Sequence, residues 1–350
     1  MTRWARLCAI GVAVTLVLAA CTRSTGSGAS SKPIDLYAAE PTLSDVQGLF
    51  GDASWWPGPP SFGVRPLDSA TMPYQERFHV IERFVHVGTA ETLDVEFKLW
   101  NSSSTATTEM SNIQSSLGTS ATGPKVGDQV LYYGSQTATA APFETATFVR
   151  TGQIIATISL SLKDSFPSVN LLGKIANKVE SRLKDVLAGK VHASSLSSTD
   201  AALLPPAGPD MTLLGSVRLP VEAVVVMLGF ASPETLAGIL HSGGVDSIVF
   251  GDYALDNDTH MEMRAGVLDF STTQNANDWI GALRGSATVD QSGIATFYDD
   301  ASGQYFSLFT SGARGAILVC RSTSAVEAAS RSCESPLSRV APAWLLNLSS

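Results

Sequence analysis

The order of strand-like and helix-like segments in this 350-residue chain occurs twice, and this repeat limits the fold more than any other feature. In each half, a segment with alternating apolar and polar residues precedes a short amphipathic stretch that stops at a glycine. Three more strand-like segments and a closing amphipathic stretch follow. The segments of the first half are 93–99, 107–118, 130–133, 145–150, 154–160 and 172–186. Those of the second half are 260–264, 277–285, 294–298, 305–310, 316–319 and 337–348.

Two further segments precede each copy. They are a short helical piece ending in glycine and an extended stretch: 43–51 and 78–87 in the first half, 221–229 and 247–255 in the second. The first alternating strands also match in their charges, because Glu262 and Arg264 stand like Glu96 and Lys98. Each copy therefore reads helix, strand, strand, helix, three strands, helix.

The connections between these strands predict the type of sheet. Short turns such as Thr151-Gly152 and Ser311-Gly312 join consecutive strands, and such turns make hairpins. Hairpins produce antiparallel pairing, and helices packed on such a sheet give a layered domain. We therefore predict an α+β fold: two tandem copies of a small domain, each with a mostly antiparallel sheet and helices packed on one face.

The N-terminus has the pattern of a secretory signal peptide. Arg3 and Arg6 precede an apolar run over 7–18, and small residues stand before Cys21. The run is shorter than the roughly 20 residues that a membrane-spanning helix needs. Residues 22–31 are rich in Gly and Ser, which is typical of a flexible linker. The sequence therefore predicts export, followed by a tether.

Leu18-Ala19-Ala20-Cys21 resembles the lipobox of bacterial lipoproteins. The resemblance implies cleavage before Cys21, a diacylglycerol thioether on that cysteine, and acyl chains such as palmitate that hold the protein on the extracytoplasmic face of the cell membrane. Two chains suffice for stable anchoring, since each buried methylene contributes about 0.8 kcal/mol. The alternative is an ordinary signal peptide with an incidental cysteine.

Length and composition predict the domain boundaries. About 310 residues follow the signal and tether, which is more than one compact core usually holds. A segment rich in Ser, Ala and Pro separates the two copies. We predict a signal peptide at 1–20, a lipidated flexible tether at 21–39, a first α+β domain at 40–190, a linker at 191–210 and a second α+β domain at 211–350.

Cysteine use fits an oxidising compartment. Cys8 leaves with the signal peptide and Cys21 is the lipid site, so Cys320 and Cys333 remain. A disulfide between them would close a loop and stabilise the fold by about 3 kcal/mol. The alternative is a pair of reduced, partly buried thiols. A zinc site is not expected, because there is no further cysteine and no histidine nearby.

The charge of the chain excludes one class of partner. The formal net charge is −9, and removal of the signal peptide makes it more negative. Nucleic-acid binding is built on Lys and Arg, so we expect no nucleic-acid partner. Anionic lipid head groups are disfavoured for the same reason, and contact with the membrane is expected through the lipid anchor alone.

Motifs for catalysis and cofactors are missing from the sequence. It has no nucleophile elbow, no phosphate-binding Gly-rich loop and no His-Glu-x-x-His. Ser181 and Lys184 match the Ser-x-x-Lys of penicillin-recognising serine enzymes, but the companion motifs of that family are absent, which favours a solvated helix face. The five histidines are scattered and are expected to be structural. We expect no cofactor and no catalytic residue, and we favour a protein that is not an enzyme.

One acidic turn is a weak candidate for a metal site. Asp256 and Asp258 resemble the start of a calcium loop, but the glycine and the distal glutamate of an EF-hand are missing. Asp and Asn are also favoured in turns for their own backbone hydrogen bonds. We therefore predict no metal here and retain these two residues only as weak candidates.

The segment 54–62 is the most unusual local composition in the chain. Its prolines and glycine disfavour regular structure, while Trp55, Trp56 and Phe62 need apolar surroundings. One reading is that the aromatic side chains fold back over the core of the first domain. The other is that they form a ligand-binding site that stacks on a sugar ring or an apolar molecule.

The layout of tandem α+β domains on a lipid tether resembles that of actinobacterial envelope lipoproteins. It is more distantly similar to the extracellular sensor domains of actinobacterial receptor kinases. The resemblance implies a non-enzymatic, membrane-anchored envelope lipoprotein that acts as a sensor or accessory module. It would bind a small apolar or sugar ligand, or an envelope protein, on or between its domains.

Two alternatives stay open. One is an envelope hydrolase whose residues converge only in three dimensions, with Asp252, Asp256 or His260 as candidates. The other is a scaffold subunit of a transport or secretion complex.

Overall fold

The computed structural model describes residues 32–64, 76–89, 91–134, 140–208, 210–228, 233–255, 258–300, 303–322 and 333–349. The predicted signal peptide, the lipobox with Cys21 and most of the tether lie outside these residues. Asp256 lies outside them too, and for Asp258 and His260 only the backbone is described. Among the helices within these ranges, none is long and apolar enough to cross a membrane.

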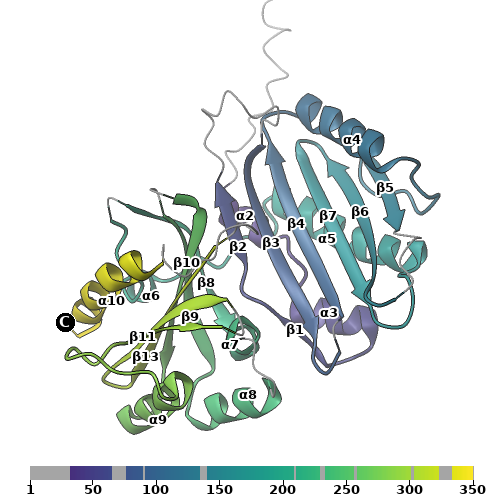
Figure 1. The fold of residues 1–350 in the computed structure, drawn as a ribbon. Coiled ribbons are helices and arrows are strands. Elements are labelled where there is room, and N and C mark those ends of the chain that lie inside the picture. The colour runs from purple at the N-terminus through teal and green to yellow at the C-terminus, as the bar shows by residue number, and fades with distance from the viewer. Residues whose placement is uncertain are drawn as a thin grey trace, which may run out of the picture. The chain divides into compact units, whose positions relative to one another are not determined.

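Seven antiparallel strands form the first sheet (Figure 1). Their order is β1-β3-β4-β7-β6-β5, and β2 pairs with β3 beside β1. The strands are β1 (Trp55–Pro57), β2 (Ser61–Val64), β3 (Glu76–His86), β4 (Thr92–Trp100), β5 (Gln129–Gly134), β6 (Phe143–Thr151) and β7 (Ile154–Leu162). The helices of this half are α2 (Pro33–Tyr37), α3 (Leu43–Phe50), α4 (Ser103–Leu117), α5 (Val169–Leu187) and the single turn α6 (Ser198–Ala201).

Six antiparallel strands form the second sheet, in the order β11-β12-β13-β10-β9-β8. The strands are β8 (Met211–Pro220), β9 (Ser247–Leu255), β10 (Asp258–Asp269), β11 (Ala295–Asp299), β12 (Gln304–Ser311) and β13 (Arg314–Ser322). The helices are α7 (Val221–Leu228), α8 (Pro233–Ser242), α9 (Thr273–Arg284) and α10 (Glu334–Ser349). The α+β class with two antiparallel sheets is as predicted.

The predicted duplication is visible in the topology. The order β3-β4-β7-β6-β5 of the first sheet recurs as β9-β10-β13-β12-β11 in the second. Helices α4 and α9 hold the same place in each copy and begin in the same way. The side chains of their N-cap residues, Ser102 and Thr272, each accept a hydrogen bond of 3.1 Å from the backbone N–H three residues on. Both helices end at a glycine with positive φ, Gly118 and Gly285.

These caps correct one detail of the predicted repeat. Counted from Ser102 and Thr272, Glu96 corresponds to Gly266 and not to Glu262. The pair Glu262–Arg264 therefore lies four residues, or two periods of the alternation, nearer the start of its strand than the position that corresponds to Glu96–Lys98. Both pairs still lie on the same face, and each forms an ion pair at 3.1 Å. Two-residue periodicity defines the face of a strand but leaves such a shift along the strand open.

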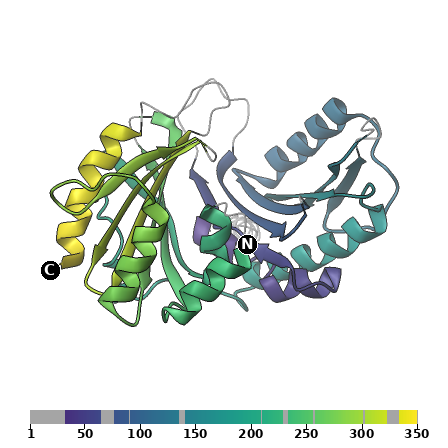
Figure 2. The same cartoon turned by 60° about the horizontal axis from the view of Figure 1, so that its bottom comes forward.

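Helices cover both faces of each sheet, which is more than the predicted single face. In β7, Ile154 packs in the core that includes α5, and its neighbour Ile155 packs with Met110 of α4. Figure 2 shows the blue α4 and the teal α5 on opposite sides of this sheet. The second sheet has α9 on the side of Ile317 and α10 on the side of Leu318. Continuous apolar runs such as 316–320 allow this, because both faces of the strand are apolar.

Short strands occur where the sequence predicted irregular structure. Strands β1 and β2 lie inside the proline-rich segment and both pair with β3. The prediction was wrong because the prolines stand where a strand tolerates them. Pro57 ends β1, and Pro59 and Pro60 fall between the two strands. Strand β8 and helix α8 were also missed in the second half.

Helix α2 lies within the segment assigned to the tether. Its Leu36 and the following Ala39 are completely buried, so this part of the chain contributes to the core. Residues 33–350 form one compact unit that contains both sheets. The boundaries of the predicted domains stay a prediction.

The predicted disulfide is present. Cys320 in β13 and Cys333, just before α10, are both completely buried and are joined, with their Cα atoms 5.7 Å apart. The bond ties the central region of the second sheet to the start of the closing helix.

Candidate functional site

Strand β3 places a carboxyl in the core. Its alternate residues Phe78, Val80 and Phe84 face inward and are buried, and Glu82 takes the position between the last two. Glu82 is 5% exposed. The alternation calls for an apolar side chain there, since burying a carboxyl is costly. Such a departure marks a position to examine for function.

A second buried carboxyl comes from the turn after α2. The backbone N–H groups of Ala39 and Glu40 donate to the carbonyls of Leu36 and Tyr37, at 2.9 and 3.0 Å, and hold this turn. Glu40 is only 3% exposed, and neither oxygen of its carboxyl has a hydrogen-bond partner among the described residues. An unpartnered buried carboxylate is expensive, so the neutral acid is favoured.

The cation whose charge acts on both carboxyls, Arg182, is already engaged elsewhere. Arg182 on α5 donates from Nε to the backbone oxygen of Glu40 at 2.8 Å and from Nη2 to that of Ala38 at 3.1 Å. Its Nη1 is 3.4 Å from a carboxylate oxygen of Asp45. The guanidinium therefore acts on the carboxyls of Glu40 and Glu82 through space and forms no hydrogen bond with either.

The pKa values of these groups follow from their burial. Burial raises the pKa of Glu82 to about 8, and the charge of Arg182 opposes the rise. Burial, followed by the charges of Glu82 and Glu96, raises the pKa of Glu40 well above its usual range. Burial and the two carboxyls also raise the pKa of Tyr37. At neutral pH the Glu82 carboxyl therefore carries its proton for most of the time.

These side chains line a cavity of about 290 Å³, called here the Glu40–Glu82 cavity. Tyr37, Glu40, Glu82 and Arg182 come from the first half of the chain. Strand β8 supplies a wall from the second half that includes Arg218, which is paired with Asp200. The exposed His192 comes from the segment predicted as the linker. The cavity thus lies where the two predicted domains meet, a common location for ligand sites.

A charged cluster joins the two sheets nearby. The hydroxyl of Ser61, in β2, donates to Oε1 of Glu262 at 2.8 Å and accepts from Nη2 of Arg264 at 2.5 Å. The second carboxylate oxygen of Glu262 accepts from Nε of Arg321. These four residues are called here the Ser61 cluster. Burial would raise the pKa of Glu262, but the charges of Arg264 and Arg321 and its hydrogen bonds lower it to about 2.

The Ser61 cluster borders a second cavity, of about 280 Å³. Its charged side chains are Arg83, Arg264 and Arg321. Arg83 is held by two hydrogen bonds of 2.7 Å to the carboxylate of Asp94. Every charged side chain of this cavity therefore has a partner, and Glu262 is too acidic to serve as a base for the Ser61 hydroxyl.

Asp252, which the sequence suggested as a candidate catalytic residue of a hydrolase, lies beneath β2. It is completely buried, and its Oδ2 accepts the backbone N–H of Phe62 at 2.7 Å. Burial and the neighbouring Glu262 raise its pKa well above the usual range. Asp252 lines neither cavity described above. The other two candidates of that hypothesis, Asp256 and the side chain of His260, lie outside the described residues.

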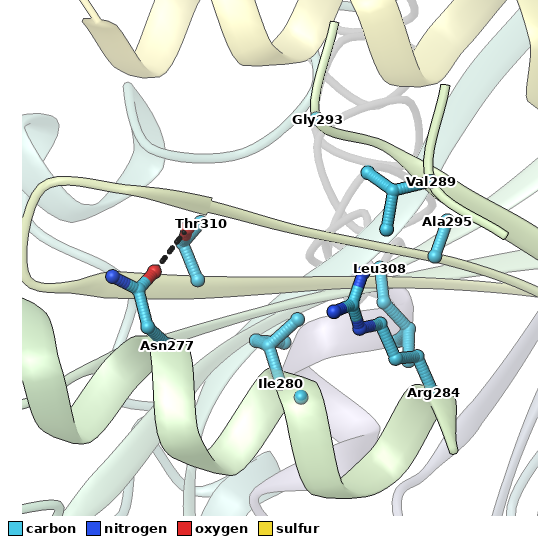
Figure 3. A pocket seen from close by; sticks show the side chains of 9 residues that line it. Asn277, Ile280, Arg284, Val289, Gly293, Ala295, Leu308 and Thr310 are labelled. Carbon is cyan, nitrogen blue, oxygen red and sulfur yellow. Dashed lines mark hydrogen bonds between the residues drawn. The ribbon is translucent and has the colours of Figure 1, made fainter. Parts of the chain in front are cut away.

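A smaller cavity of about 200 Å³ lies between α9 and the β11–β12 edge (Figure 3). Ile280, Val289 and Leu308 line it with apolar groups, and Arg284 extends along it. The hydroxyl of Thr310 donates to Oδ1 of Asn277 at 2.8 Å, as the dashed line in the figure shows. Its described lining residues include no carboxyl and no unpartnered buried group.

The aromatic candidates of the proline-rich segment point into the fold. Trp55 is 2% exposed and stacks on Phe50, with ring centroids 4.4 Å apart. Phe62 is 3% exposed and meets the edge of Tyr37 at 5.8 Å. Trp56 is half-buried against the same core. This placement is what a covering role requires; their predicted ligand-binding role stays a prediction.

Sequence reasoning missed Glu40, Glu82 and Arg182. A signal existed for Glu82, because it interrupts an alternation of core residues. None existed for Glu40, whose burial depends on how the turn after α2 packs. Within the described ranges, no group of three or more His, Cys, Asp or Glu side chains is placed to hold a metal ion.

Comparisons with known proteins give one distant structural match. No family model and no curated protein matches the chain. Among solved structures, the extracellular domain of PknH from Mycobacterium tuberculosis aligns with 11% sequence identity and a TM-score of 0.36. The alignment covers 44% of this chain and 97% of that domain. At this TM-score the likeness supports no inference about fold or function.

Proposed function

We propose that the protein is a membrane-anchored envelope lipoprotein that binds a small polar ligand in the Glu40–Glu82 cavity. One observation carries the proposal: Glu40 belongs to the lining of a cavity, is almost fully buried, and has no hydrogen-bond partner for either carboxyl oxygen among the described residues. An apolar residue of similar size would be more stable at such a place. A binding role accounts for a carboxyl where stability alone disfavours one.

Binding fits the two carboxyls better than acid–base catalysis does. A catalytic pair needs one protonated and one ionised group, with pKa values pushed apart by their surroundings. Here burial moves the pKa values of Glu40 and Glu82 in the same direction. The pair therefore lacks the asymmetry that a hydrolase of this type requires.

The anchor rests on the N-terminal sequence. The signal-peptide pattern and the lipobox before Cys21 support lipidation and an extracytoplasmic location. The disulfide between Cys320 and Cys333 suits an oxidising compartment.

Native mass spectrometry of the exported protein tests the ligand. We expect a defined additional small-molecule mass on the wild-type chain and its loss in Glu40→Gln. The control Glu144→Gln changes an exposed carboxyl of the same sheet and should retain the mass. If the wild type has the bare polypeptide mass, and small polar compounds leave its melting temperature unchanged, the binding function is wrong.

Cell fractionation tests the anchor. Cys21→Ala should release the protein in soluble form or leave it unprocessed, because no acyl chains can be attached. Cys8→Ala removes a cysteine within the predicted signal peptide and should leave membrane retention unchanged. Retention of Cys21→Ala equal to that of the wild type would exclude lipid anchoring.

A further inference from the structure

The Glu40–Glu82 cavity has an imbalance between its acids and its cations. Two buried carboxyls lie beside it, and both of its guanidiniums are committed elsewhere. Arg182 binds two backbone carbonyls and Asp45, and Arg218 binds Asp200 and Ser247. A neutral or anionic ligand would leave these carboxyls as they are. A cationic group would give them a direct ion pair, which no cation in the described part of the chain forms with either.

We propose that the Glu40–Glu82 cavity recognises a small organic molecule through a primary ammonium group, which Glu40 and Glu82 bind as carboxylates. This inference rests on the proposed ligand-binding function and adds the chemical class of the ligand. An ammonium group offers three N–H donors on a compact charge, and carboxylate oxygens are its natural acceptors.

A metal ion suits the cavity less well. Calcium takes six to eight oxygen ligands, and magnesium requires near-octahedral geometry. The described part of the chain has no set of three acidic, His or Cys side chains placed for a metal. The backbone oxygens of Ala38 and Glu40, which could supplement the two carboxyls, already accept from Arg182.

The remaining walls suit a carbon skeleton. Leu43, Pro57 and Val217 contribute apolar surface, and the ring of Tyr37 lies beside the carboxyls. An aromatic face also attracts a cation. At about 290 Å³ the cavity is at the small end of the range for ligand sites. A short amine therefore fits better than a long polyamine or a peptide.

Proton balance gives this binding mode a pH signature. The free cavity holds protons on both carboxyls at neutral pH, and the incoming ammonium displaces the protons of Glu40 and Glu82 to the buffer. Affinity should therefore rise with pH, by about tenfold per pH unit for each proton released. Above about pH 8 the Glu82 carboxyl is already ionised, so the slope should fall by the part that this proton contributes.

Isothermal titration calorimetry with three matched probes tests the inference. The probes are n-propylammonium, the neutral n-propanol and tetramethylammonium, which carries the charge without N–H donors. We expect binding of n-propylammonium alone, stronger as the pH rises toward about 8, with proton release measured in two buffers of different ionisation enthalpy. Glu82→Gln should weaken it about tenfold or more and reduce the number of protons released by one, whereas Glu144→Gln should leave both unchanged.

The probes and the pH series need only the wild-type chain, so the test does not depend on the folding of a variant. Binding of n-propanol as strong as that of n-propylammonium, or affinity independent of pH, would overturn the ammonium inference. If a neutral or anionic molecule co-purifies and is lost in Glu40→Gln, the binding function holds and the ammonium inference fails. If nothing binds in either experiment, both fail.

Discussion

Glu82 shows how one residue can couple stability to pH. Its carboxyl lies in the inward row of β3 between Val80 and Phe84, where water cannot solvate a charge. In the unfolded chain the same carboxyl ionises near its ordinary pKa of 4.5, and in the folded protein it ionises at about 8. The folded state therefore holds this proton more tightly than the unfolded state does.

The free energy of unfolding should fall as the pH rises from 4.5 to about 8. In this window the unfolded chain has lost the proton and the folded chain keeps it, so the slope is about −1.4 kcal/mol per pH unit for this group. Below the window both states are protonated and the stability is fully present. Urea unfolding over this pH range checks the slope, which Glu82→Gln should reduce and Glu144→Gln should preserve. An unchanged slope in Glu82→Gln would assign the effect to other groups.

Trp55, in contrast to Glu82, stabilises the folded state through apolar contacts. Trp55→Ala should cost about 3–5 kcal/mol, because it removes a buried ring stacked on Phe50 and leaves a cavity. The half-buried Trp56 is the matched control, and Trp56→Ala should cost clearly less. Chemical denaturation measures both. Equal and small losses would mean that neither ring covers the core.

At the scale of elements, the two copies use the same local devices. Helices α4 and α9 each follow the second strand of their copy. Each begins after a Ser or Thr N-cap, and each ends at a glycine. A cap satisfies backbone N–H groups that no helical carbonyl can reach. Because this requirement is local, it recurs in both copies although most of the side chains around it differ.

The two N-caps should contribute similar amounts to the free energy of unfolding. Ser102→Ala and Thr272→Ala should each lower the free energy of unfolding by about 1 kcal/mol, since each removes an acceptor for a backbone N–H. Ser104→Ala, at an exposed position in the first turn of α4, serves as the control and should have little effect. Midpoints of urea unfolding give the comparison. A loss confined to one copy would show that only one of the caps contributes.

At the scale of the whole molecule, polar contacts from a short strand connect the two sheets. Ser61 and Phe62 of β2 pair with β3 of the first sheet and hydrogen-bond to Glu262, Arg264 and Asp252 of the second. One apolar core also includes residues of both sheets. The Glu40–Glu82 cavity therefore has walls from both halves, and its shape depends on this connection.

Removal of Glu262 should weaken that connection strongly. Glu262→Ala leaves Arg264, whose side chain is 9% exposed, without its carboxylate, and this should cost about 3–5 kcal/mol. Asp269→Ala breaks an exposed ion pair with Arg314 and should cost less than about 1 kcal/mol. Differential scanning calorimetry of both variants checks the difference. Losses of the same size would mean that the Ser61 cluster contributes no more than a surface pair.

The sequence by itself determined the parts of this protein that depend on neighbouring residues. Alternation placed strands such as β4 and β7, glycines marked the ends of α4 and α9, and the last two cysteines predicted their own disulfide. Their physical causes, side-chain periodicity and backbone hydrogen bonding, act over a few residues. The α+β class and the duplication follow from these signals taken in order.

Only the tertiary structure decided which groups meet. Glu40, Glu82 and Arg182 are far apart in the chain, and their burial depends on how α2, β3 and α5 pack. Burial and the neighbouring Glu262 raise the pKa of Asp252, and a hydrogen bond from β2 opposes the rise. Periodicity tells which face of an element turns inward, but not what packs against that face. Desolvation and charge pairing act between groups that packing brings together, so the candidate site could be recognised only in three dimensions.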